Sequence, residues 1–430
     1  MTFDSLGLAA PLLRALADAG HAAPTDVQHA TLPPAVGGRD LMIASSTGSG
    51  KTAAYLLPAL ERVLAANSAG TPPGAAPKGP GTLVLAPTRE LALQVAQAAS
   101  VYGRHVPGLR VATVVGGVPY AAQLRALRGR LDILIATPGR LLDHLRSGQA
   151  SLARVELFVL DEADRMLDLG FFDDIRTIAE HLPERHQTLM LSATFAGHVG
   201  RLAQGLLADP QRIDVAAHTE AHADIEQRLH WADDGRHKDA LLDHVLTQRD
   251  VDQALVFTST QRDADVLADR LAEMGHKVAS LHGGMPQGRR NRVLQGLRSR
   301  HLRVLVATDV AARGIDVPSI SHVVNYGLPM KPEDYVHRIG RTGRAGKSGL
   351  AVTLAERRDG GMIHRIQRFT TQTIPVATIG GLEPKRPVVQ AAPRPPMRRK
   401  PAPGGKPPMR RTVDRPPGAA RRDGVRRDGA

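Results

Sequence analysis

Short runs of apolar residues recur along the first half of the chain, and each run ends in small, polar or turn-forming residues. These runs are Leu41–Ala44, Thr82–Ala86, Val111–Val115, Ile133–Ala136, Leu157–Leu160 and Thr188–Leu191. Helix-like stretches such as Glu90–Val101 and Gly139–Leu145 lie between them. Continuous apolar strands that alternate with helices are typical of a parallel sheet covered on both faces. The pattern therefore predicts an α/β fold.

The pattern pauses at Ala208–Ala223, a polar stretch rich in histidine, and then resumes. The later runs are Ala254–Phe257, Val278–Leu281, Val304–Ala307, His322–Asn325 and Leu350–Leu354. The repetition predicts two α/β domains of similar build, at residues 1–215 and 224–384, joined by a linker at residues 216–223. Ala69–Gly81 has the sequence AGTPPGAAPKGPG and is predicted to be a surface loop.

The basic charge of the chain is concentrated near its C-terminus. Of the net charge of +14, residues 385–430 contribute +11, because they contain 14 Lys and Arg against 3 Asp. This segment is rich in Pro, Arg and Gly, so we predict a disordered tail. Such a tail indicates a polyanion partner, most often nucleic acid, and a solubilising tail is the alternative. Aromatic residues make up only 3% of the chain, which argues against a base-stacking platform.

Composition excludes several classes of protein. Cysteine is absent, which excludes disulfides and thiolate metal sites and fits a reducing compartment. The start MTFDSLGLAA has no basic segment followed by a long apolar one, so we expect no signal peptide. No run approaches the ~18 apolar residues of a membrane span. We expect a cytoplasmic protein with no membrane contact.

A phosphate-binding loop is predicted directly after the first apolar run, where Ser45–Thr52 has the sequence SSTGSGKT. The loop Thr47–Gly50 can wrap backbone N–H groups around phosphates, Lys51 would reach the outer phosphates, and Thr52 would hold Mg²⁺. A helix that begins near Lys51 would add its positive N-terminal end. Ser45 stands where the pattern usually has glycine. A Gly-rich turn with a surface lysine is the alternative, but the order strand, turn, helix favours the phosphate site.

Two acids with a catalytic pattern follow the apolar run Leu157–Leu160, in the sequence Asp-Glu-Ala-Asp at residues 161–164. The carboxyl end of a parallel strand is where open α/β sheets bind ligands. Asp161 is placed to hold the Mg²⁺ shell, and Glu162 to orient and deprotonate an attacking water. A solvated acidic helix start is the alternative, since acids suit helix N-termini.

Short motifs in a fixed order make the chain resemble DEAD-box RNA helicases, most closely those of the bacterial RhlE type. The first-domain motifs are Pro24–Gln28, Ser45–Thr52, Pro87–Leu91, Gly116–Gly117, Thr137–Arg140, Asp161–Asp164 and Ser192–Thr194. The second-domain motifs are Val256–Thr260, Gln287 with Arg290, Ala307–Asp309, Ala312–Asp316 and His337–Arg344. Each motif is weak alone, but their common order across roughly Phe3–Leu382 leaves essentially no room for chance. The resemblance implies tandem RecA-like domains that use ATP and Mg²⁺ and bind RNA.

The resemblance also implies nucleotide-binding residues in both domains. Gln28 should read the adenine edge, with Phe3 packing nearby, and Asp316 should bind the ribose. Arg341 and Arg344 should meet the γ-phosphate, one of them as an arginine finger supplied in cis. The implied nucleotide-binding set is Phe3, His21, Gln28, Ser46, Thr47, Gly48, Ser49, Gly50, Lys51, Thr52, Gly314, Asp316, Arg341 and Arg344.

Catalysis and coupling are implied in the same way. The implied catalytic residues are Lys51, Asp161, Glu162, Arg341 and Arg344, with Thr52 and Asp161 at the metal. Ser192 and Thr194 should bond with Asp164. Together with His337, these residues should couple hydrolysis to domain movement.

An RNA path is implied by further motif residues. They are Pro87, Thr88, Arg89, Gly117, Thr137, Pro138, Gly139, Arg140, Gln287, Arg290 and Thr308. Most of them are small, hydroxylic or arginine, which suits contacts to phosphate and sugar rather than to base edges. They lie at predicted strand ends and helix starts, where free N–H groups donate hydrogen bonds to phosphate oxygens. Recognition should therefore be largely independent of sequence, and contacts to 2′-hydroxyls would favour RNA over DNA.

Three residues depart from the family pattern. His21 stands where the family usually stacks an aromatic residue on adenine, and an imidazole stacks less well. Asp26 replaces a proline, and Ser46 replaces a glutamine of the phosphate loop. These departures bear on adenine affinity more than on catalysis.

The sequence thus predicts an ATP-dependent RNA helicase that remodels short duplexes and hydrolyses ATP to ADP and phosphate. A DNA translocase is the first alternative, because the same two-domain core serves DNA motors. A non-enzymatic RNA-binding or annealing protein is the second. The motifs around Gln28, Pro87–Leu91 and residues 161–164 argue against the first, and the intact catalytic set argues against the second.

Overall fold

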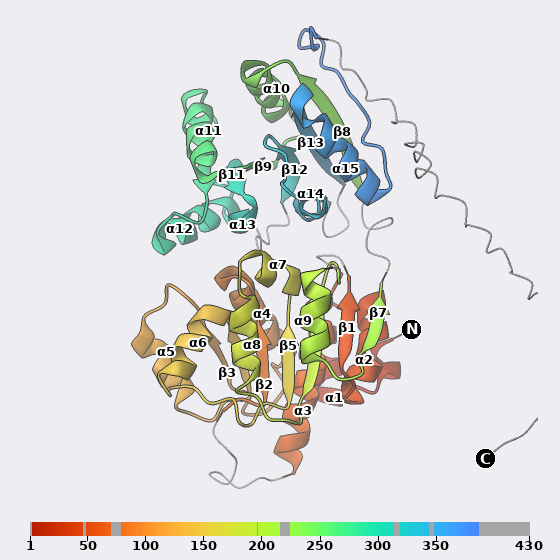
Figure 1. Cartoon of the computed structure of the whole chain (residues 1–430), viewed down its shortest axis with the longest axis vertical. Coiled ribbons are helices and arrows are strands. Elements are labelled where there is room, and N and C mark those ends of the chain that lie inside the picture. The colour runs from red at the N-terminus through yellow and green to blue at the C-terminus, as the bar shows by residue number, and fades with distance from the viewer. Residues whose placement is uncertain are drawn as a thin grey trace, which may run out of the picture. The chain divides into compact units, whose positions relative to one another are not determined.

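The computed structural model describes residues 2–45, 49–69, 79–195, 197–215, 224–312, 319–343 and 348–386. Within these residues the chain forms two parallel sheets flanked by helices (Figure 1). None of the described helices is long and apolar enough to cross a membrane.

The first sheet contains seven described strands in the order β3-β4-β2-β5-β6-β1-β7, and every neighbouring pair is parallel. The strands are β1 (Leu41–Ala44), β2 (Thr82–Leu85), β3 (Val111–Val114), β4 (Ile133–Ala136), β5 (Leu157–Leu160), β6 (Gln187–Ser192) and β7 (Gln211–Asp214). The flanking helices are η1 (Phe3–Leu6), α1 (Ala10–Asp18), α2 (Asp26–Val36), α3 (Lys51–Ser68), α4 (Arg89–Tyr102), α5 (Tyr120–Leu127), α6 (Pro138–Arg146), α7 (Ala163–Asp168), α8 (Phe172–Ala179) and α9 (His198–Leu206). The six apolar runs predicted as strands are all strands, so this part of the fold prediction is confirmed.

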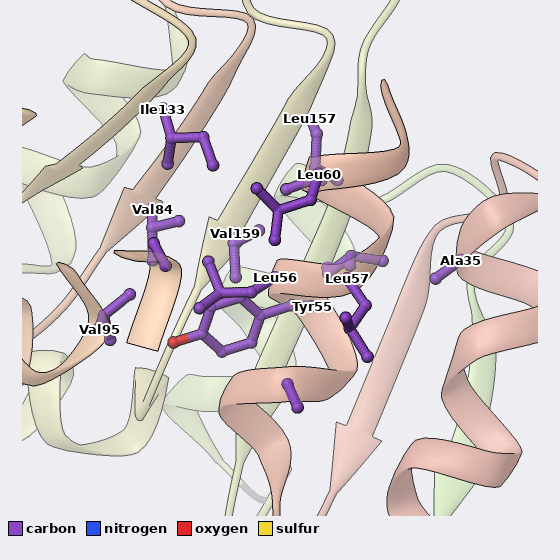
Figure 2. Close-up of a cluster of buried hydrophobic side chains, with 14 of the residues drawn as sticks. Ala35, Tyr55, Leu56, Leu57, Leu60, Val84, Val95, Ile133, Leu157 and Val159 are labelled. Carbon is purple, nitrogen blue, oxygen red and sulfur yellow. The ribbon is translucent and has the colours of Figure 1, made fainter. Parts of the chain in front are cut away.

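Alternate residues of these strands pack on opposite faces of the sheet, as the two-residue period of a strand requires. Val84 and Val159 lie in one apolar cluster with residues of α1 to α4. Leu83 and Phe158 lie in a second cluster with residues of α6 to α9. Figure 2 shows part of the first cluster, where Leu56, Leu57 and Leu60 lie over strand residues such as Val159. Burial on both faces explains why the strands are continuously apolar.

The second sheet contains six described strands in the order β10-β11-β9-β12-β13-β8, again with parallel neighbours. The strands are β8 (Ile225–Ala232), β9 (Gln253–Thr258), β10 (Val278–Leu281), β11 (Val304–Thr308), β12 (Ile320–Asn325) and β13 (Gly349–Glu356). The helices are α10 (Gly235–Thr247), α11 (Gln261–Glu273), α12 (Gln287–Arg298), α13 (Asp309–Ala312), α14 (Pro332–Ile339), η2 (Arg357–Asp359) and α15 (Gly360–Thr370). The five predicted strands of this half are also found.

One strand lies where the pattern was predicted to pause. β7 pairs with β1 at the edge of the first sheet, inside the stretch Ala208–Ala223. Of its four residues only Ile213 is buried. An edge strand with a single inward residue has no apolar run, so the sequence pattern could not show it. The predicted linker at residues 216–223 lies outside the described residues.

The predicted tail is described only at its first two residues. The backbone N–H groups of Lys385 and Arg386 donate hydrogen bonds to the carboxylate of Asp233, at 2.8 and 3.0 Å. Residues 387–430 lie outside the described residues, as do residues 70–78 of the predicted surface loop.

Candidate ATP and RNA site

The strand order separates the predicted site residues of the first domain into two adjacent groups. The predicted RNA residues follow β2, β3 and β4, which lie side by side at one end of the sheet. The predicted phosphate and acid residues follow β1 and β5, and Ser192 ends β6 between those two strands. Because the strands are parallel, all of these residues lie at the same edge of the sheet. We call the first group the RNA region and the second the phosphate region.

The phosphate region begins at the turn between β1 and α3. Gly50 precedes α3 with a φ of 92°, a left-handed backbone conformation that favours glycine. Lys51 is the first residue of the helix, and its Nζ donates a hydrogen bond to the carbonyl of Ser45, 3.0 Å away. Its ammonium is thus held at the residue that directly follows β1. Ser46, Thr47 and Gly48 lie outside the described residues.

Two side chains of the first predicted motif hold this turn. The Gln28 Nε2 donates to the carbonyl of Gly50 at 3.1 Å, and its Oε1 accepts from the backbone N–H of Thr25 at 3.0 Å. The Thr25 hydroxyl donates to the carbonyl of Ser49 at 2.8 Å. A Cβ at position 50 would lie 2.5 Å from the Gln28 amide nitrogen, so this close approach requires glycine. Gln28, the residue predicted to read adenine, is therefore hydrogen-bonded to the turn predicted to hold phosphate.

Asp161 is fully enclosed at the end of β5. The Tyr55 hydroxyl donates a hydrogen bond to its Oδ2 at 2.8 Å, and Tyr55 itself is completely buried on α3. Burial raises the pKa of Asp161 to about 6, although the Lys51 charge acts to lower it. Burial likewise raises the pKa of Tyr55 well above its usual value, while a hydrogen bond with Thr52 opposes that shift. Thr52, Tyr55 and Asp161 thus form one connected polar group in an otherwise apolar setting.

These residues fit a hydrated Mg²⁺ bound to a nucleotide. A buried carboxylate with a raised pKa lacks solvation of its charge, which a nearby cation would restore. Among the described residues no cluster of three or more His, Asp or Glu could form an all-protein metal cage. Mg²⁺ is usually held by one or two carboxylates together with phosphates and water, so a single Asp with a Thr hydroxyl matches that preference.

Glu162 has an unusual backbone conformation. It precedes α7 with φ 52° and ψ 54°, in the left-handed region, which a non-glycine residue enters at an energetic cost. Its side chain is half-buried, unlike that of its neighbour Asp161. The sharp turn places adjacent acids in different surroundings, and a partly solvated carboxylate can meet a water molecule.

The predicted coupling residues are only partly brought together by the described contacts. The Ser192 hydroxyl donates to the carbonyl of Thr194 at 2.7 Å, so these two residues close a tight turn after β6. Burial raises the pKa of Asp164, and the nearest nitrogen of His337 lies 4.0 Å from its Oδ2. The bonds from Ser192 and Thr194 to Asp164 remain a prediction.

The predicted adenine residues are placed differently from one another. Phe3 is buried in the apolar cluster of the first domain. His21 is exposed, and its Nε2 lies 3.3 Å from the Tyr102 hydroxyl, with the two rings tilted and their centroids 5.7 Å apart. Tyr102 thus supplies an aromatic ring next to the departure from the family pattern.

In the RNA region, helix starts and side-chain bonds shape the loops. Thr88 and Thr137 are the N-cap residues of α4 and α6, and the Thr88 Oγ1 accepts from the N–H of Leu91 at 3.3 Å. The Arg89 Nη1 donates to the carbonyl of Gly116 at 3.2 Å, and the Arg140 Nη1 donates to the carbonyl of Val118 at 3.1 Å. The two arginines therefore bond to the loop after β3 at the residues before and after Gly117.

The loop that they hold contains Gly117, with a φ of 71°. A Cβ at this position would lie 3.1 Å from the Arg89 guanidinium, so the glycine allows the arginine to approach. The Arg89 Nε is buried and has no hydrogen-bond partner among the described residues. A phosphate oxygen would satisfy such a donor. Pro138 and Gly139 stand in the first turn of α6, where helix N–H groups lack intrahelical partners.

In the second domain the predicted RNA residues also lie at the ends of neighbouring strands. Gln287 and Arg290 lie on α12 after β10, and Thr308 ends β11, the neighbouring strand. Arg290 donates from Nη1 to the carbonyl of His282 at 3.1 Å and from Nη2 to the Glu90 carboxylate at 3.0 Å. An arginine that pairs with a carboxylate oxygen has the geometry to pair with a phosphate oxygen.

The predicted arginines after β12 are described in part. The Arg341 Nε donates to the carbonyl of His337 at 3.2 Å, and its side chain is buried. The neighbouring Arg338, not predicted to be functional, is bound by both carboxylate oxygens of Asp309 at 2.6 and 2.8 Å and fixes α14 against the sheet. Gly314, Asp316 and Arg344 lie outside the described residues.

Three residues that the sequence interpretation passed over support the site. Tyr55 donates a hydrogen bond to Asp161 and lies four residues after Lys51 on α3. Its hydroxyl on an otherwise apolar helix face was the feature of the sequence that could have indicated this role. Gln123 is buried, donates to the carbonyls of Val115 and Val118, both at 3.1 Å, and accepts from the Val115 N–H at 3.1 Å. Glu90, quoted only as part of a motif, is the partner of Arg290. No pattern in the sequence distinguishes Gln123.

Both halves of the chain match helicase family models. Residues 25–202 match the DEAD/DEAH box helicase family, and residues 237–346 match the helicase conserved C-terminal domain. The chain is 42% identical over 385 residues to ATP-dependent RNA helicase SrmB of Escherichia coli, and this alignment covers 89% of the chain and 85% of SrmB. It is 42% identical over 382 residues to ATP-dependent RNA helicase DeaD of the same organism, and this alignment covers 89% of the chain and 59% of DeaD. The chain thus spans about six tenths of that longer relative.

Solved structures that are similar over most of the chain include complexes with RNA. A structure of Dbp5 from S. cerevisiae bound to RNA and ADP BeF3 is 30% identical and has a TM-score of 0.78, covering 88% of this chain and 95% of that one. A structure of Mss116p bound to ssRNA and AMP-PNP is 27% identical with a TM-score of 0.79, covering 89% of this chain and 81% of that one.

Proposed function

This chain belongs to the DEAD-box family of ATP-dependent RNA helicases, and from that premise we propose which of its residues bind ATP, hydrolyse it and hold RNA. Its two parallel sheets are tandem RecA-like domains. We propose that it binds single-stranded RNA through the sugar-phosphate backbone and unwinds or remodels short duplexes while it hydrolyses ATP to ADP and phosphate. The observation that carries the proposal is the strand order of the first sheet, in which the RNA region and the phosphate region share one edge.

Domain boundaries at residues 1–215 and 224–384 leave each sheet whole and separate the two groups of catalytic residues. The phosphate region belongs to the first domain, whereas Arg341 and Arg344 belong to the second. Hydrolysis therefore requires both domains, and a movement of one domain against the other is the natural link between ATP and RNA.

In the proposed site, Lys51 neutralises the outer phosphates and the N–H groups of Ser49, Gly50 and the start of α3 bind phosphate oxygens. Thr52 and Asp161 would hold Mg²⁺, which supplies charge neutralisation at the phosphates when bound. Tyr55 keeps the Asp161 carboxylate oriented toward that position through its hydrogen bond. Ser46, Thr47 and Gly48 complete the phosphate loop in this proposal.

Glu162 is the proposed general base. Its half-buried carboxylate would accept a proton from the water that attacks the γ-phosphate. Arg341 and Arg344 would stabilise the charge that develops on the transferred phosphoryl group. Asp164, Ser192, Thr194 and His337 would transmit the state of this site between the domains, as the short distance from Asp164 to His337 supports.

Adenosine recognition is proposed for Gln28, Phe3 and His21 on the first domain and for Gly314 and Asp316 on the second. Gln28 supports this role because its amide is fixed between Thr25 and Gly50, so a bound base would meet a preset edge. His21 offers an imidazole face supported by Tyr102.

RNA phosphates and sugars would bind along the RNA region and its counterpart on the second domain. The proposed contacts are Pro87, Thr88, Arg89, Gly117, Thr137, Pro138, Gly139, Arg140, Gln287, Arg290 and Thr308. Helix N-termini at Thr88 and Thr137 and the arginines provide donors for phosphate and few groups for base edges, so binding should not depend on RNA sequence.

One experiment tests the proposal against its alternatives. ATP hydrolysis is measured with no nucleic acid, with single-stranded RNA and with single-stranded DNA. We expect strong stimulation by RNA and little by DNA. Equal stimulation by DNA would favour a DNA translocase, and RNA binding without hydrolysis would favour an annealing protein.

A further inference from the structure

The helix α12 and the turn after it form the most consistently basic stretch of the second domain. From Gln287 through Arg303 the chain contains six arginines and no acid. These arginines are Arg289, Arg290, Arg292, Arg298, Arg300 and Arg303. The helix α11, which packs on the other face of the sheet, has four acids and two arginines, so the basic character belongs to α12 and not to the helices of this domain in general. Figure 1 shows α11 and α12 as separate helices of this domain.

The buried face of α12 fixes which residues point outward. Val293, Leu294 and Leu297 pack in an apolar cluster with β9 and β11. The opposite face exposes Asn291, Arg292, Gln295 and Arg298. We call these four residues the α12 outer face.

A ridge connects this face with the proposed RNA path. Gln287, Asn291 and Arg298 lie on one side of the helix because their spacing follows its 3.6-residue turn. The Gln287 Nε2 donates to the Asn291 Oδ1 at 3.1 Å, so the ridge begins with a bonded pair. From Gln287 to Arg298 the ridge is about 16 Å long, since a helix rises about 1.5 Å per residue.

Several arginines of this stretch are already used. Arg290 pairs with Glu90, the Arg300 Nη2 lies 3.2 Å from the Asp252 Oδ2, and the Arg303 Nη2 donates to the carbonyl of Val251 at 2.8 Å. Arg292 and Arg298, in contrast, form no ion pair within the part of the chain that the structure describes. Exposed cations without acidic partners on one face of a helix are the pattern that a polyanion would match.

We propose that the α12 outer face is a second RNA-phosphate surface that continues the RNA path beyond Gln287. The proposal rests on the proposed function, since it takes Gln287 as the point where RNA enters the ridge. Arg292 and Arg298 bind phosphates, and Asn291 and Gln295 offer amide donors to phosphate or sugar. No aromatic side chain stands on this face, so it holds the backbone of flanking RNA and reads no bases.

The test uses RNA length as the probe. Two series of oligouridylates are lengthened stepwise, one at the 5′ end and one at the 3′ end, and their affinity for the full chain is measured at several salt concentrations. The variant R292Q/R298Q removes two charges but keeps long polar side chains. The control R365Q/R368Q removes two exposed arginines of α15, another helix of the same domain.

We expect the α12 variant to bind the shortest RNA like the wild type and to lose several-fold in affinity for RNA lengthened at one end only. Its plot of log affinity against log salt for that longer RNA should be shallower by about 1.4, because each neutralised phosphate contributes about 0.7 for single strands. The control variant should keep the wild-type slope for every RNA.

Two results would overturn the proposal. Parallel salt slopes for wild type and α12 variant would show that the outer face does not touch RNA. An equal loss in the control would show a general effect of net charge. Stimulation of ATP hydrolysis by the shortest RNA tests the proposed function separately, because that RNA does not reach the α12 outer face.

Discussion

The RNA region and the phosphate region lie on neighbouring strands of one sheet, yet they differ in the buried charge and backbone strain that they contain. In the RNA region Gln123, Arg89 and Arg140 bond to backbone carbonyls and hold the loop after β3. In the phosphate region Asp161 is buried with its pKa raised to about 6, and Glu162 is held in a left-handed conformation. Hydrogen bonds hold the loop of the RNA region, whereas the phosphate region combines a turn that is also held with a buried carboxylate and a strained backbone.

The two regions therefore place different demands on their ligands. An RNA backbone makes many weak contacts, so loops that are already ordered avoid an entropic cost on binding. A nucleotide with its metal brings concentrated charge, and it can relieve the buried carboxylate that the folded chain tolerates at a cost. If Asp161 has the proposed role, part of the binding energy for ATP and its metal comes from neutralising this buried carboxylate.

The largest effect is expected from removing the proposed base. Glu162→Gln should lower the rate of ATP hydrolysis about 10²- to 10⁴-fold, the usual contribution of a positioned general base. ATP affinity should stay near wild type, because the phosphate contacts of Lys51 remain. Rates come from single-turnover hydrolysis and affinity from a fluorescent ATP analogue, with Lys51→Ala as the comparison that should lose affinity. Hydrolysis close to the wild-type rate would remove Glu162 from this role.

A second change should stabilise the protein. Asp161 has a pKa raised from 3.8 to about 6, so the folded chain retains a proton that the unfolded chain has lost between those values. Stability from this group therefore falls as pH rises through that window, and above pH 6 the loss is at most about 3 kcal/mol. Asp161→Asn should raise the free energy of unfolding at neutral pH by up to that amount and flatten its pH dependence between about 4 and 6.

Denaturant unfolding of nucleotide-free protein across that pH range measures this. ATP with Mg²⁺ provides the control, because it should stabilise the wild type by mass action and Asp161→Asn much less. A variant less stable than the wild type at neutral pH would mean that Tyr55 and Lys51 fully compensate the buried charge.

Glu162 and Asp161 were identified from the sequence, but the arrangement of the site around them was not. Lys51 and Glu162 stand in local patterns, a loop before a helix and acids after a strand, and local patterns are visible in one dimension. The order β3-β4-β2-β5-β6-β1 depends on which strands pair, so the division into two adjacent regions was not visible. The same holds for β7, whose single buried residue Ile213 leaves no pattern.

Supporting residues were invisible for a related reason. The buried amide of Gln123 bonds to the backbone of Val115, eight residues earlier in the chain. In a sequence, such a buried glutamine cannot be distinguished from an exposed polar residue on a short helix. Arg290 was predicted to bind RNA, but its partner Glu90 lies 200 residues away. Pairs at such distances are set by tertiary packing alone.

The bracing of the RNA region can be broken at Gln123. Gln123→Leu would leave the N–H and carbonyl of Val115 buried without partners, at a cost of about 1–3 kcal/mol. We expect the RNA concentration for half-maximal stimulation of ATP hydrolysis to rise about tenfold, corresponding to about 1.4 kcal/mol. The KM for ATP and the kcat at saturating RNA should change little. Gln123→Glu keeps the acceptor for Val115 and should fall between; equal changes in kcat and KM would indicate general unfolding instead.

The smallest effect is expected at the cap of α4. Thr88→Ala removes the oxygen that accepts from the Leu91 N–H and should destabilise the first domain by about 1 kcal/mol. Thr88→Ser restores the oxygen and should recover most of that loss. Thermal unfolding in the absence of RNA measures both variants. If Ala and Ser behave alike, the cap does not contribute to the bracing.

The left-handed backbone of Glu162 has a consequence for selection by stability. Glycine occupies this conformation without the steric penalty of a side chain, which is of order 1–2 kcal/mol. A library screened only for thermal resistance would therefore enrich glycine at position 162 and discard the proposed base. Thermal stability and the rate of ATP hydrolysis thus favour different residues at position 162. Selection for a more thermostable variant must therefore measure both properties.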